Sequence, residues 1–330
     1  MCGGKSGRVT CELSALHGGI PTVSKDAITR RDFIRRALGA GLAACGLAEL
    51  GGFGTTDGAS AEAAAGSTIV VASRKDPAGL VRAAVGALGG MGKFVKRGAR
   101  VLVKPNIGWA RRPEQAATTN PEVVAEVVRL CKQAGAREVK VVDHAVDRPD
   151  SLILKMTGIE SAATKAGARV RMASSPALYE KVTLRGARVL KSADVLRDMR
   201  RADVVINVPI AKVHNGTRLT LGCKNLMGTV LDRGAWHRSN LEQCIADFVA
   251  EFPPDLVILD AIRILLTNGP KGPGRTEDKG LIVAGTDSVA VDAYAATLFG
   301  QRAERIEHLK LAHAMGAGEI DLERIRIRNV

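Results

Sequence analysis

Short apolar runs alternate with helix-like patterns along the chain from residue 66 onward. Residues 68–72, 100–103 and 138–142 are apolar, β-branched runs typical of buried strands. Asn120-Pro121-Glu122 combines a capping side chain, a proline at the first turn and an acid, which predicts the start of a helix. Apolar residues then recur at helical spacing until Gly135 ends the helix. Further strands are expected at residues 169–173, 203–206, 256–259, 281–284 and 325–327.

This alternation favours the α/β class of folds. Strands that are apolar throughout indicate a mostly parallel sheet with helices on both faces. Residues 181–190 predict a small β-hairpin insertion, because two short runs flank Arg185-Gly186. We expect residues 66–330 to form a single α/β domain, which is a length that suits one core.

Polar side chains follow the predicted strands at the point where each strand ends. In a parallel sheet the carboxyl ends of the strands form one edge, and ligands bind there. We therefore expect several segments to meet at one rim, although an aspartate at such a position can equally cap a helix. The residues at these positions are Lys104, Asn106, Asp143, His144, Asn207, Lys212, His214, Asp260 and Asp287.

The stretch from residue 207 to residue 237 is unusually rich in donor groups of mixed type. Cationic and amide side chains just past a strand end suggest a site for an anionic or oxygen-rich ligand. A solvated loop on a basic protein is the alternative interpretation. The ligand-binding candidates are Asn106, Asn207, Lys224, Asn225 and Arg233, and the catalytic candidates are Lys104, Lys212, His214 and His237.

Two kinds of chemistry fit these residue types. In the first, lysines bind an anion while His214 or His237 moves a proton. In the second, a divalent metal is held by His and carboxylate ligands, which suit Zn, Fe or Ni. The metal candidates are Asp143, His144 and Asp260, with His214 and Asp292 as further members of the set. No pair of these residues has a tight metal-binding spacing.

A Gly/Pro-rich cationic loop occupies residues 268–275. It lacks the G-K-[ST] ending of a P-loop, so it does not predict a nucleotide cradle. A mobile lid that carries Lys271 and Arg275 is one interpretation, and a plain surface loop is the other.

Residues 1–65 have the features of a twin-arginine signal peptide and its cleavage region. Arg30-Arg31 precedes a weakly apolar stretch at residues 37–54, and small residues suited to signal peptidase follow at 59–65. The apolar stretch is too weak for a membrane span of about 20 residues, so the mature chain is expected to have no transmembrane span. Leu42-Ala43-Ala44-Cys45 resembles a lipoprotein box, which leaves a lipid anchor at Cys45 open. The expected partner is the twin-arginine export machinery, and the expected location is the periplasm or cell envelope.

Composition narrows the partners and cofactors. The chain carries a formal net charge of +14, but aromatic residues make up only 3%, which disfavours base stacking and hence nucleic-acid binding. Three cysteines lie beyond the signal region, at Cys131, Cys223 and Cys244, and no C-x-x-C occurs among them. We therefore expect no iron–sulfur cluster in this chain. Pairing of Cys223 with Cys244 stays open.

The ordered motifs resemble the DUF362 family. They are Lys104-Pro105-Asn106, Asn120-Pro121-Glu122, Asp143-His144, Asn207-Val-Pro-Ile-Ala-Lys212-Val-His214, Cys223-Lys224-Asn225-Leu-Met-Gly228, Arg233 to His237, Asp260 and Thr286-Asp287-Ser288-Val-Ala-Val-Asp292. The resemblance covers the chain from about Lys96 to its end and implies a single α/β domain without a settled activity. Some relatives look like iron–sulfur proteins through attached ferredoxin modules, whose cysteines this chain lacks. A distant likeness to the nickel-dependent lactate racemase type is a further hypothesis.

Together these features predict an exported α/β protein with a ligand site at the carboxyl rim of its sheet. We expect an enzyme that acts on a small anionic substrate, with or without a divalent metal. The alternative is a non-catalytic extracytoplasmic ligand-binding or redox-accessory protein.

Overall fold

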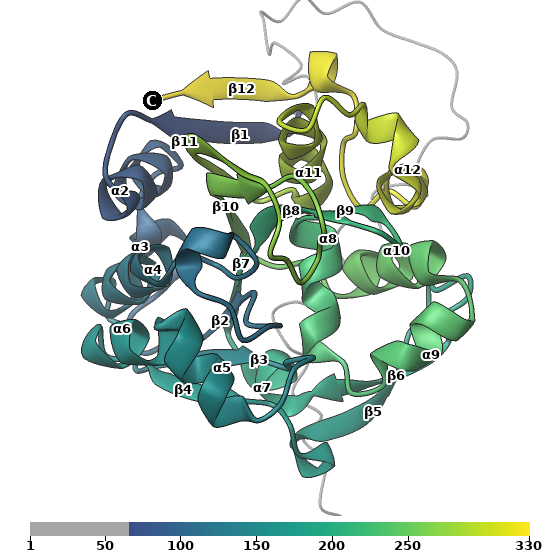
Figure 1. Cartoon of the computed structure of the whole chain (residues 1–330), viewed down its shortest axis with the longest axis horizontal. Helices are drawn as coiled ribbons and strands as arrows, with labels where there is room; N and C mark the ends of the chain where they lie inside the picture. Colours follow the sequence, from purple (N-terminus) through teal and green to yellow (C-terminus); the bar gives the residue numbers. More distant parts are fainter. Residues whose placement is uncertain (1–65) are drawn as a thin grey trace, which may run out of the picture. The chain divides into compact units, whose positions relative to one another are not determined.

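A ten-stranded sheet lies at the centre of the computed structural model, which describes residues 66–330 (Figure 1). Eight strands follow one path in the order β12-β1-β11-β10-β7-β2-β3-β4, and β8 and β9 extend it beside β10. The strands of this sheet are β1 (Thr68–Ser73), β2 (Arg100–Pro105), β3 (Glu138–Asp143), β4 (Arg169–Met172), β7 (Val204–Val208), β8 (Ile210–His214), β9 (Arg218–Thr220), β10 (Leu256–Leu265), β11 (Thr276–Gly285) and β12 (Arg326–Asn329).

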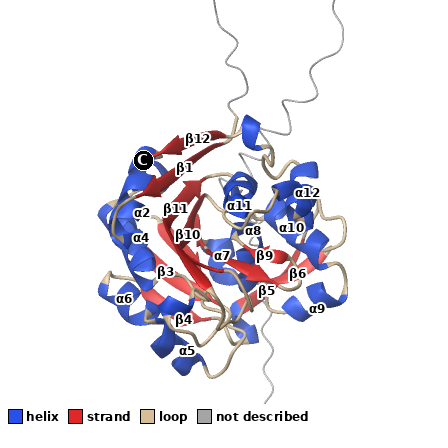
Figure 2. Ribbon diagram, turned by 45° about the horizontal axis from the view of Figure 1, so that its top comes forward, coloured by secondary structure: helices blue, strands red, loops and turns tan. Residues whose placement is uncertain are grey.

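Helices cover both faces of the sheet, as Figure 2 shows. One face carries α2 (Pro77–Ala87), α4 (Pro121–Gln133) and α6 (Ile159–Lys165), and the other carries α8 (Gly222–Asn225), α10 (Leu241–Glu251), α11 (Ser288–Thr297) and α12 (Glu307–Ala314). The other α-helices of residues 66–330 are α3 (Met91–Phe94), α5 (Asp150–Thr157), α7 (Arg197–Arg201) and α9 (Arg233–Arg238). The α/β class with two covered faces is therefore confirmed.

The apolar strands contribute side chains to two hydrophobic cores, one on each face of the sheet, because successive side chains of a strand point to opposite faces. In β1, Ile69 and Val71 pack with the α10–α11 side, whereas Val70 and Ala72 pack with the α2–α4 side. All four are buried. This two-sided burial explains why the strands read as continuous apolar runs rather than as alternating ones.

Most neighbouring strands are parallel, but β11 runs antiparallel to both β10 and β1. Gly285 at the carboxyl end of β11 pairs with Val257 near the start of β10. Asp287 therefore lies at the opposite edge of the sheet from the carboxyl ends of β2, β3 and β7, and the expectation that it joins their rim is wrong. It caps α11 instead, accepting hydrogen bonds from the amides of Val289 and Ala290.

The predicted hairpin exists with different limits. Strands β5 (Tyr179–Thr183) and β6 (Ser192–Leu196) pair in a separate antiparallel sheet, with Tyr179 opposite Leu196. The sequence prediction placed the second strand at residues 188–190, which instead belong to the longer turn. The amides of Arg188, Val189 and Leu190 in that turn donate to the Asp247 carboxylate on α10.

Two strands, β8 and β9, form from residues that the sequence suggested were a loop. β8 carries Lys212 and His214 and pairs with β10. β10 itself has ten residues, whereas the sequence predicted a run of four. Because β10 continues to Leu265, Asp260 lies inside the strand and not at its end. These differences move the polar residues of β8 onto the sheet itself, where their positions are fixed by backbone pairing.

The described residues belong to one compact unit. Within them Cys131, Cys223 and Cys244 are all buried free thiols, and no helix is long and apolar enough to cross a membrane. The twin-arginine pattern, the cleavage region and Cys45 lie outside the described residues.

Candidate functional site

A cavity of about 560 Å³ opens at the carboxyl ends of β2, β3 and β8. Its other walls come from residues 220–237 and from the loop that joins β10 to β11. Nearly all of the candidate site residues line it. The lining consists of Lys104, Asn106, Gly108, Trp109, Asp143, His144, Val146, Lys212, His214, Asn215, Thr220, Lys224, Asn225, Met227, Gly228, Leu231, Asp232, Arg233, Gly234, His237 and Pro270.

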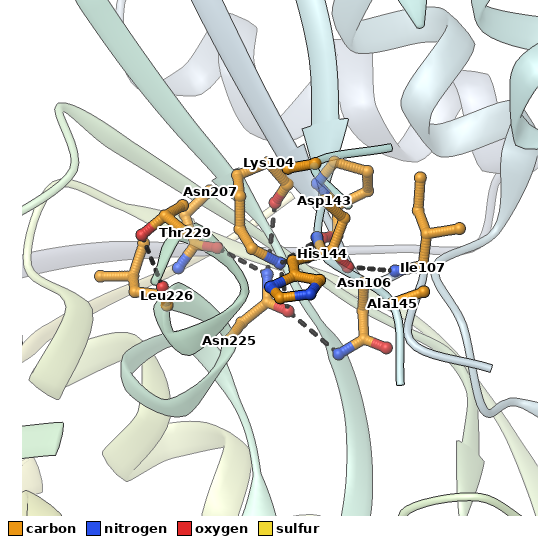
Figure 3. A network of polar contacts seen from close by, with 12 residues as sticks. Lys104, Asn106, Ile107, Asp143, His144, Ala145, Asn207, Asn225, Leu226 and Thr229 are labelled. Carbon is orange, nitrogen blue, oxygen red and sulfur yellow. Dashed lines mark hydrogen bonds and ion pairs between the residues drawn. The ribbon is translucent and has the colours of Figure 1, made fainter. Parts of the chain in front are cut away.

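A buried ion pair forms the floor of the cavity (Figure 3). Lys104 Nζ lies 2.8 Å from Asp143 Oδ1. It also donates to the carbonyl oxygen of Pro105 at 2.6 Å and to Asn225 Oδ1 at 3.1 Å. These three acceptors match the three N–H groups of a lysine ammonium. Lys104 therefore has the contacts of a charged, fully bonded structural lysine, although burial lowers its pKa.

The Asp143 carboxylate also has several hydrogen-bond partners. Besides Lys104, its carboxylate accepts from the amide of Ile107 at 2.6 Å and from that of His144 at 2.8 Å. Gly228 packs directly against the pair, and a Cβ there would overlap Asp143 Oδ1 and lie 2.8 Å from Lys104 Nζ. The glycine is required because only its missing side chain leaves room for the ion pair.

Three asparagines connect the strands to the α8 turn. Asn225 donates from Nδ2 to Asn207 Oδ1 at 2.8 Å, and its Oδ1 accepts from Asn106 Nδ2 at 3.0 Å. Asn207 donates in turn to the carbonyl oxygen of Gly222 at 2.8 Å. Asn207 is fully buried and does not line the cavity, so it orients Asn225 rather than contacting a ligand.

Lys212 differs from Lys104 in its contacts. Its Nζ donates to the carbonyl oxygen of Ala117 at 2.5 Å and to Asn106 Oδ1 at 3.1 Å. Among the described residues no carboxylate lies within ion-pair distance of it. Burial, reinforced by the neighbouring charge of Lys224, lowers the pKa of Lys212 to about 7. Near neutral pH a substantial fraction of this side chain is therefore a neutral amine.

Of the three lysines that line the cavity, Lys224 has the weakest hydrogen bonding. It lies on α8 and is buried, and its Nζ contacts the Met227 sulfur at 3.4 Å. A thioether is only a weak acceptor. Burial lowers the pKa of Lys224 to about 8, while Glu242 acts in the opposite direction. The side chain is thus mostly charged at neutral pH, with ammonium donors free to meet a ligand.

The two histidines considered for proton transfer, His214 and His237, differ in burial. His214 Nδ1 accepts from the amide of Gly216 at 2.9 Å, which places the ring proton on Nε2. Burial and the nearby lysines lower the pKa of His214 to about 3, so the ring stays neutral. His237 lies on the exposed side of α9 at the cavity wall, and its pKa is lowered by its partial burial and by Lys224.

Arg233 ties α9 to the end of β3. Its guanidinium donates to the carbonyl oxygens of His144 at 2.8 Å and Ala145 at 2.9 Å. These contacts use two of the five N–H groups of an arginine, and the group lines the cavity. His144 is held by a contact of 3.3 Å between Nδ1 and the carbonyl oxygen of Val230.

The structure does not bring Asp143, His144 and Asp260 together as metal ligands. β7 and β2 lie between the strands that carry Asp260 and Asp143, a separation of three strand spacings or about 14 Å. Asp260 accepts from the amides of Asn120 and Ile262, and burial raises its pKa to about 6. No group of three or more potential metal ligands occurs in the described part of the chain.

Asp292, also considered as a metal ligand, has a positioning role instead. Its carboxylate accepts from the amides of Gly222 at 2.7 Å and Cys223 at 2.8 Å, at the start of the turn that presents Lys224 and Asn225. Burial raises its pKa to about 6. A carboxylate on one helix that holds the amino end of another short helix cannot be recognised from sequence spacing, because the two lie about 70 residues apart.

The cavity also has an apolar flank, which the sequence patterns did not indicate. Trp109, Val146, Met227, Leu231 and Pro270 line this part of the wall. The signal that could have pointed to it is Trp109, one of two tryptophans in a chain with few aromatic residues, just after a predicted strand end.

The Gly/Pro-rich loop reaches the cavity through Pro270. Lys271 Nζ lies 3.0 Å from Asp147 Oδ1 and 5.5 Å from the centre of the Trp109 ring. Arg111 donates to the carbonyl oxygens of Lys271 and Gly272. The loop is thus in the position expected of a lid, and its mobility stays a prediction.

Replacing Lys271 by Ala should loosen this loop without unfolding the protein. The lost ion pair and cation–π contact are partly exposed, so the free energy of unfolding should change by no more than about 1 kcal/mol. Amide hydrogen exchange in residues 266–275 should become faster. Lys279→Ala, which removes a comparable exposed pair with Glu277, is the control; equal exchange in both variants would show that Lys271 does not hold the loop.

One family model matches more than half of the chain. Residues 101–297 match the family model described as a domain of unknown function, DUF362. A thylakoid-associated protein of Synechocystis is 32% identical over 223 residues, which are 62% of this chain and 64% of that protein. A Thermotoga maritima crystal structure has a TM-score of 0.45 at 11% identity, over 69% of this chain and 60% of that one. The lactate racemase apoprotein of Thermoanaerobacterium thermosaccharolyticum has a TM-score of 0.39 at 10% identity, over 66% and 54%. The chain thus spans less than two thirds of each of these proteins.

Proposed function

The chain belongs to the DUF362 family, and we propose that its cavity is an enzyme site that binds a small organic anion and exchanges a proton with it through Lys212. The observation that carries this proposal is the unequal bonding of the three buried lysines. Lys104 has three acceptors, Lys212 has two and Lys224 has a thioether contact.

An excess of positive charge supports an anionic ligand. Four cationic side chains line the cavity against two carboxylates, Asp143 and Asp232. Asp143 is neutralised by Lys104, and Asp232 is largely exposed and lies 3.4 Å from Arg238. The charges of Lys224 and Arg233 are then left for the ligand. A buried cation without a counter-ion costs stability, which a bound carboxylate or phosphate group would offset.

Lys212 is the residue best suited to proton transfer. A general base works best when its pKa lies near the operating pH, and burial brings that of Lys212 to about 7. His214 complements it as a neutral ring whose Nε2–H can donate to a ligand oxygen. Lys104, a catalytic candidate from the sequence, is assigned a structural role because its three donors are already used.

Metal assistance has weaker support. Asp143 would have to release Lys104 or a backbone amide before it could bind a cation. We therefore assign the chemistry of the site to its amines and imidazoles.

The proposal is tested by the fluorescence of Trp109 at the cavity wall. In a Trp236→Phe background, phenyllactate should quench or shift the emission with saturation, whereas 2-phenylethanol, which lacks the carboxylate, should not. Accelerated exchange of the C3 protons of phenylpyruvate in D₂O, lost in Lys212→Met, would support the enzyme. Saturable binding without exchange would favour the non-catalytic ligand-binding alternative, and equal response to acid and alcohol would contradict the anion site.

We also propose that the protein is exported by the twin-arginine route, on the basis of residues 29–65 of the sequence. Changing both Arg30 and Arg31 to Lys should retain the protein in the cytoplasm, because the export machinery reads the arginine pair. Cell fractionation measures the result. Arg35→Lys with Arg36→Lys is the matched control, and export of both variants would contradict the assignment.

A further inference from the structure

The hydrogen bonds of Lys212 are those of a free amine. A neutral lysine amine has two N–H groups and one lone pair, and two carbonyl-type oxygens, of Ala117 and the Asn106 side chain, accept from Lys212 Nζ. Lys104, in the same cavity, has three oxygen acceptors, one of which is a carboxylate. Among the described residues these two contacts use both N–H groups of a neutral Lys212, and its lone pair stays available for a ligand. The side chain lines the cavity.

The surroundings favour the neutral form of Lys212. The charged groups that act on it are Lys224 on α8 and Lys104 on β2, which disfavour its protonation, and Asp143 on β3, which favours it. Asp143 is already paired with Lys104. Burial is the larger influence and brings the pKa of Lys212 to about 7. Buried lysines with lowered pKa values are the ones that serve proteins as bases and nucleophiles.

We propose that Lys212 is a nucleophile that forms an imine with the carbonyl group of a 2-oxo acid, an inference that rests on the proposed function and names its substrate class. The amine lone pair attacks the carbonyl carbon. The carbonyl oxygen takes both amine protons and leaves as water, and the C=O bond is replaced by a C=N bond. No oxidant, reductant or other co-reactant is required.

The rest of the cavity fits such a ligand. The carboxylate of a 2-oxo acid is adjacent to its carbonyl, so an imine at Lys212 places the carboxylate near the ammonium group of the neighbouring Lys224, which has free donors. The remaining part of the ligand would face the apolar flank formed by Trp109, Met227 and Leu231. A 2-oxo acid with an apolar body thus meets a cation, a nucleophile and an apolar wall at once.

Borohydride trapping tests this proposal. The wild-type protein is incubated with phenylpyruvate and sodium borohydride, digested and mapped by mass spectrometry. Hydride addition to an imine fixes the ligand as a secondary amine, so the Lys212 peptide should gain the mass of the ligand less one oxygen atom. Samples with borohydride and phenyllactate, which has no ketone, should show no adduct. Lys212→Arg, which keeps N–H donors on a side chain of similar length but has no nucleophilic amine, should lose the adduct, with the melting temperature as the check on folding.

The outcomes separate this inference from the proposed function. An adduct confined to Lys212 supports it. An adduct at Lys224 or spread over surface lysines overturns it. Absence of any adduct while phenyllactate still binds overturns the imine and leaves the anion site standing, whereas absence of binding by both acids overturns both. The assignment needs no variant, because the wild-type peptide map locates the adduct.

Discussion

Replacing Asp143 by Ala is expected to destabilise the protein by about 3–5 kcal/mol, because it leaves the buried Lys104 without its counter-ion. The amides of Ile107 and His144 also lose their acceptor. Urea unfolding followed by circular dichroism measures the change. A loss of under about 1 kcal/mol would show that the pair does not hold the cavity floor, since such small values are typical of exposed ion pairs.

A double-mutant cycle assigns this effect to the pair. Lys104→Met removes the cation, and the double variant Lys104→Met with Asp143→Ala should be far more stable than the sum of the two single losses predicts. The coupling should exceed about 1 kcal/mol, as expected for groups in direct contact. Additive losses would mean that the two side chains stabilise the protein independently.

Replacing Lys212 by Met should abolish imine formation and remove a pH dependence of stability. The folded-state pKa of Lys212 is about 7 against 10.5 for an ordinary lysine. Between these values the unfolded chain binds the extra proton, so the wild-type protein becomes more stable as the pH rises through this window. Each proton contributes about 1.4 kcal/mol per pH unit. The variant should therefore show a shallower rise in its free energy of unfolding from about pH 7 to about pH 10.

The measurement is a set of urea unfolding curves across that pH range. Lys165→Met, at an exposed position on α6, serves as the control and should retain the slope of the wild-type protein. Identical slopes for Lys212→Met and the wild-type protein would show that Lys212 is protonated in the fold, and the amine chemistry assigned to it would then fail.

The sequence predicted the class of fold because its strands are buried on both faces. Residues 68–72, 100–103 and 138–142 all lie within β1, β2 and β3, since two-sided burial produces apolar runs that local pattern reveals. The direction of β11 was not predictable, because the apolar pattern of residues 281–284 is the same whether the strand runs parallel or antiparallel to its neighbours. That reversal is why Asp287 lies away from the rim.

The candidate site was anticipated as a set of residues, but the roles of its members were not. Lys104, Asp143 and Lys212 gather at one cavity because parallel strands end at one edge. Their division into a structural ammonium, its counter-ion and a free amine depends on which carbonyl oxygens each side chain reaches. Those contacts involve Pro105, Ala117 and Asn225 in the fold, and nothing in local pattern specifies them.

Calorimetric titration of phenyllactate tests the central claim most directly, namely that the uncommitted charge of Lys224 makes this cavity a receptor for organic anions. A charge-assisted hydrogen bond contributes about 1.5–3 kcal/mol, so Lys224→Met should bind about 10–100-fold more weakly than the wild-type protein, while Lys165→Met should bind like it. Binding by the wild-type protein should also weaken as the pH rises above about 8, where Lys224 loses its proton. Equal affinities for the wild-type protein and Lys224→Met would contradict the account.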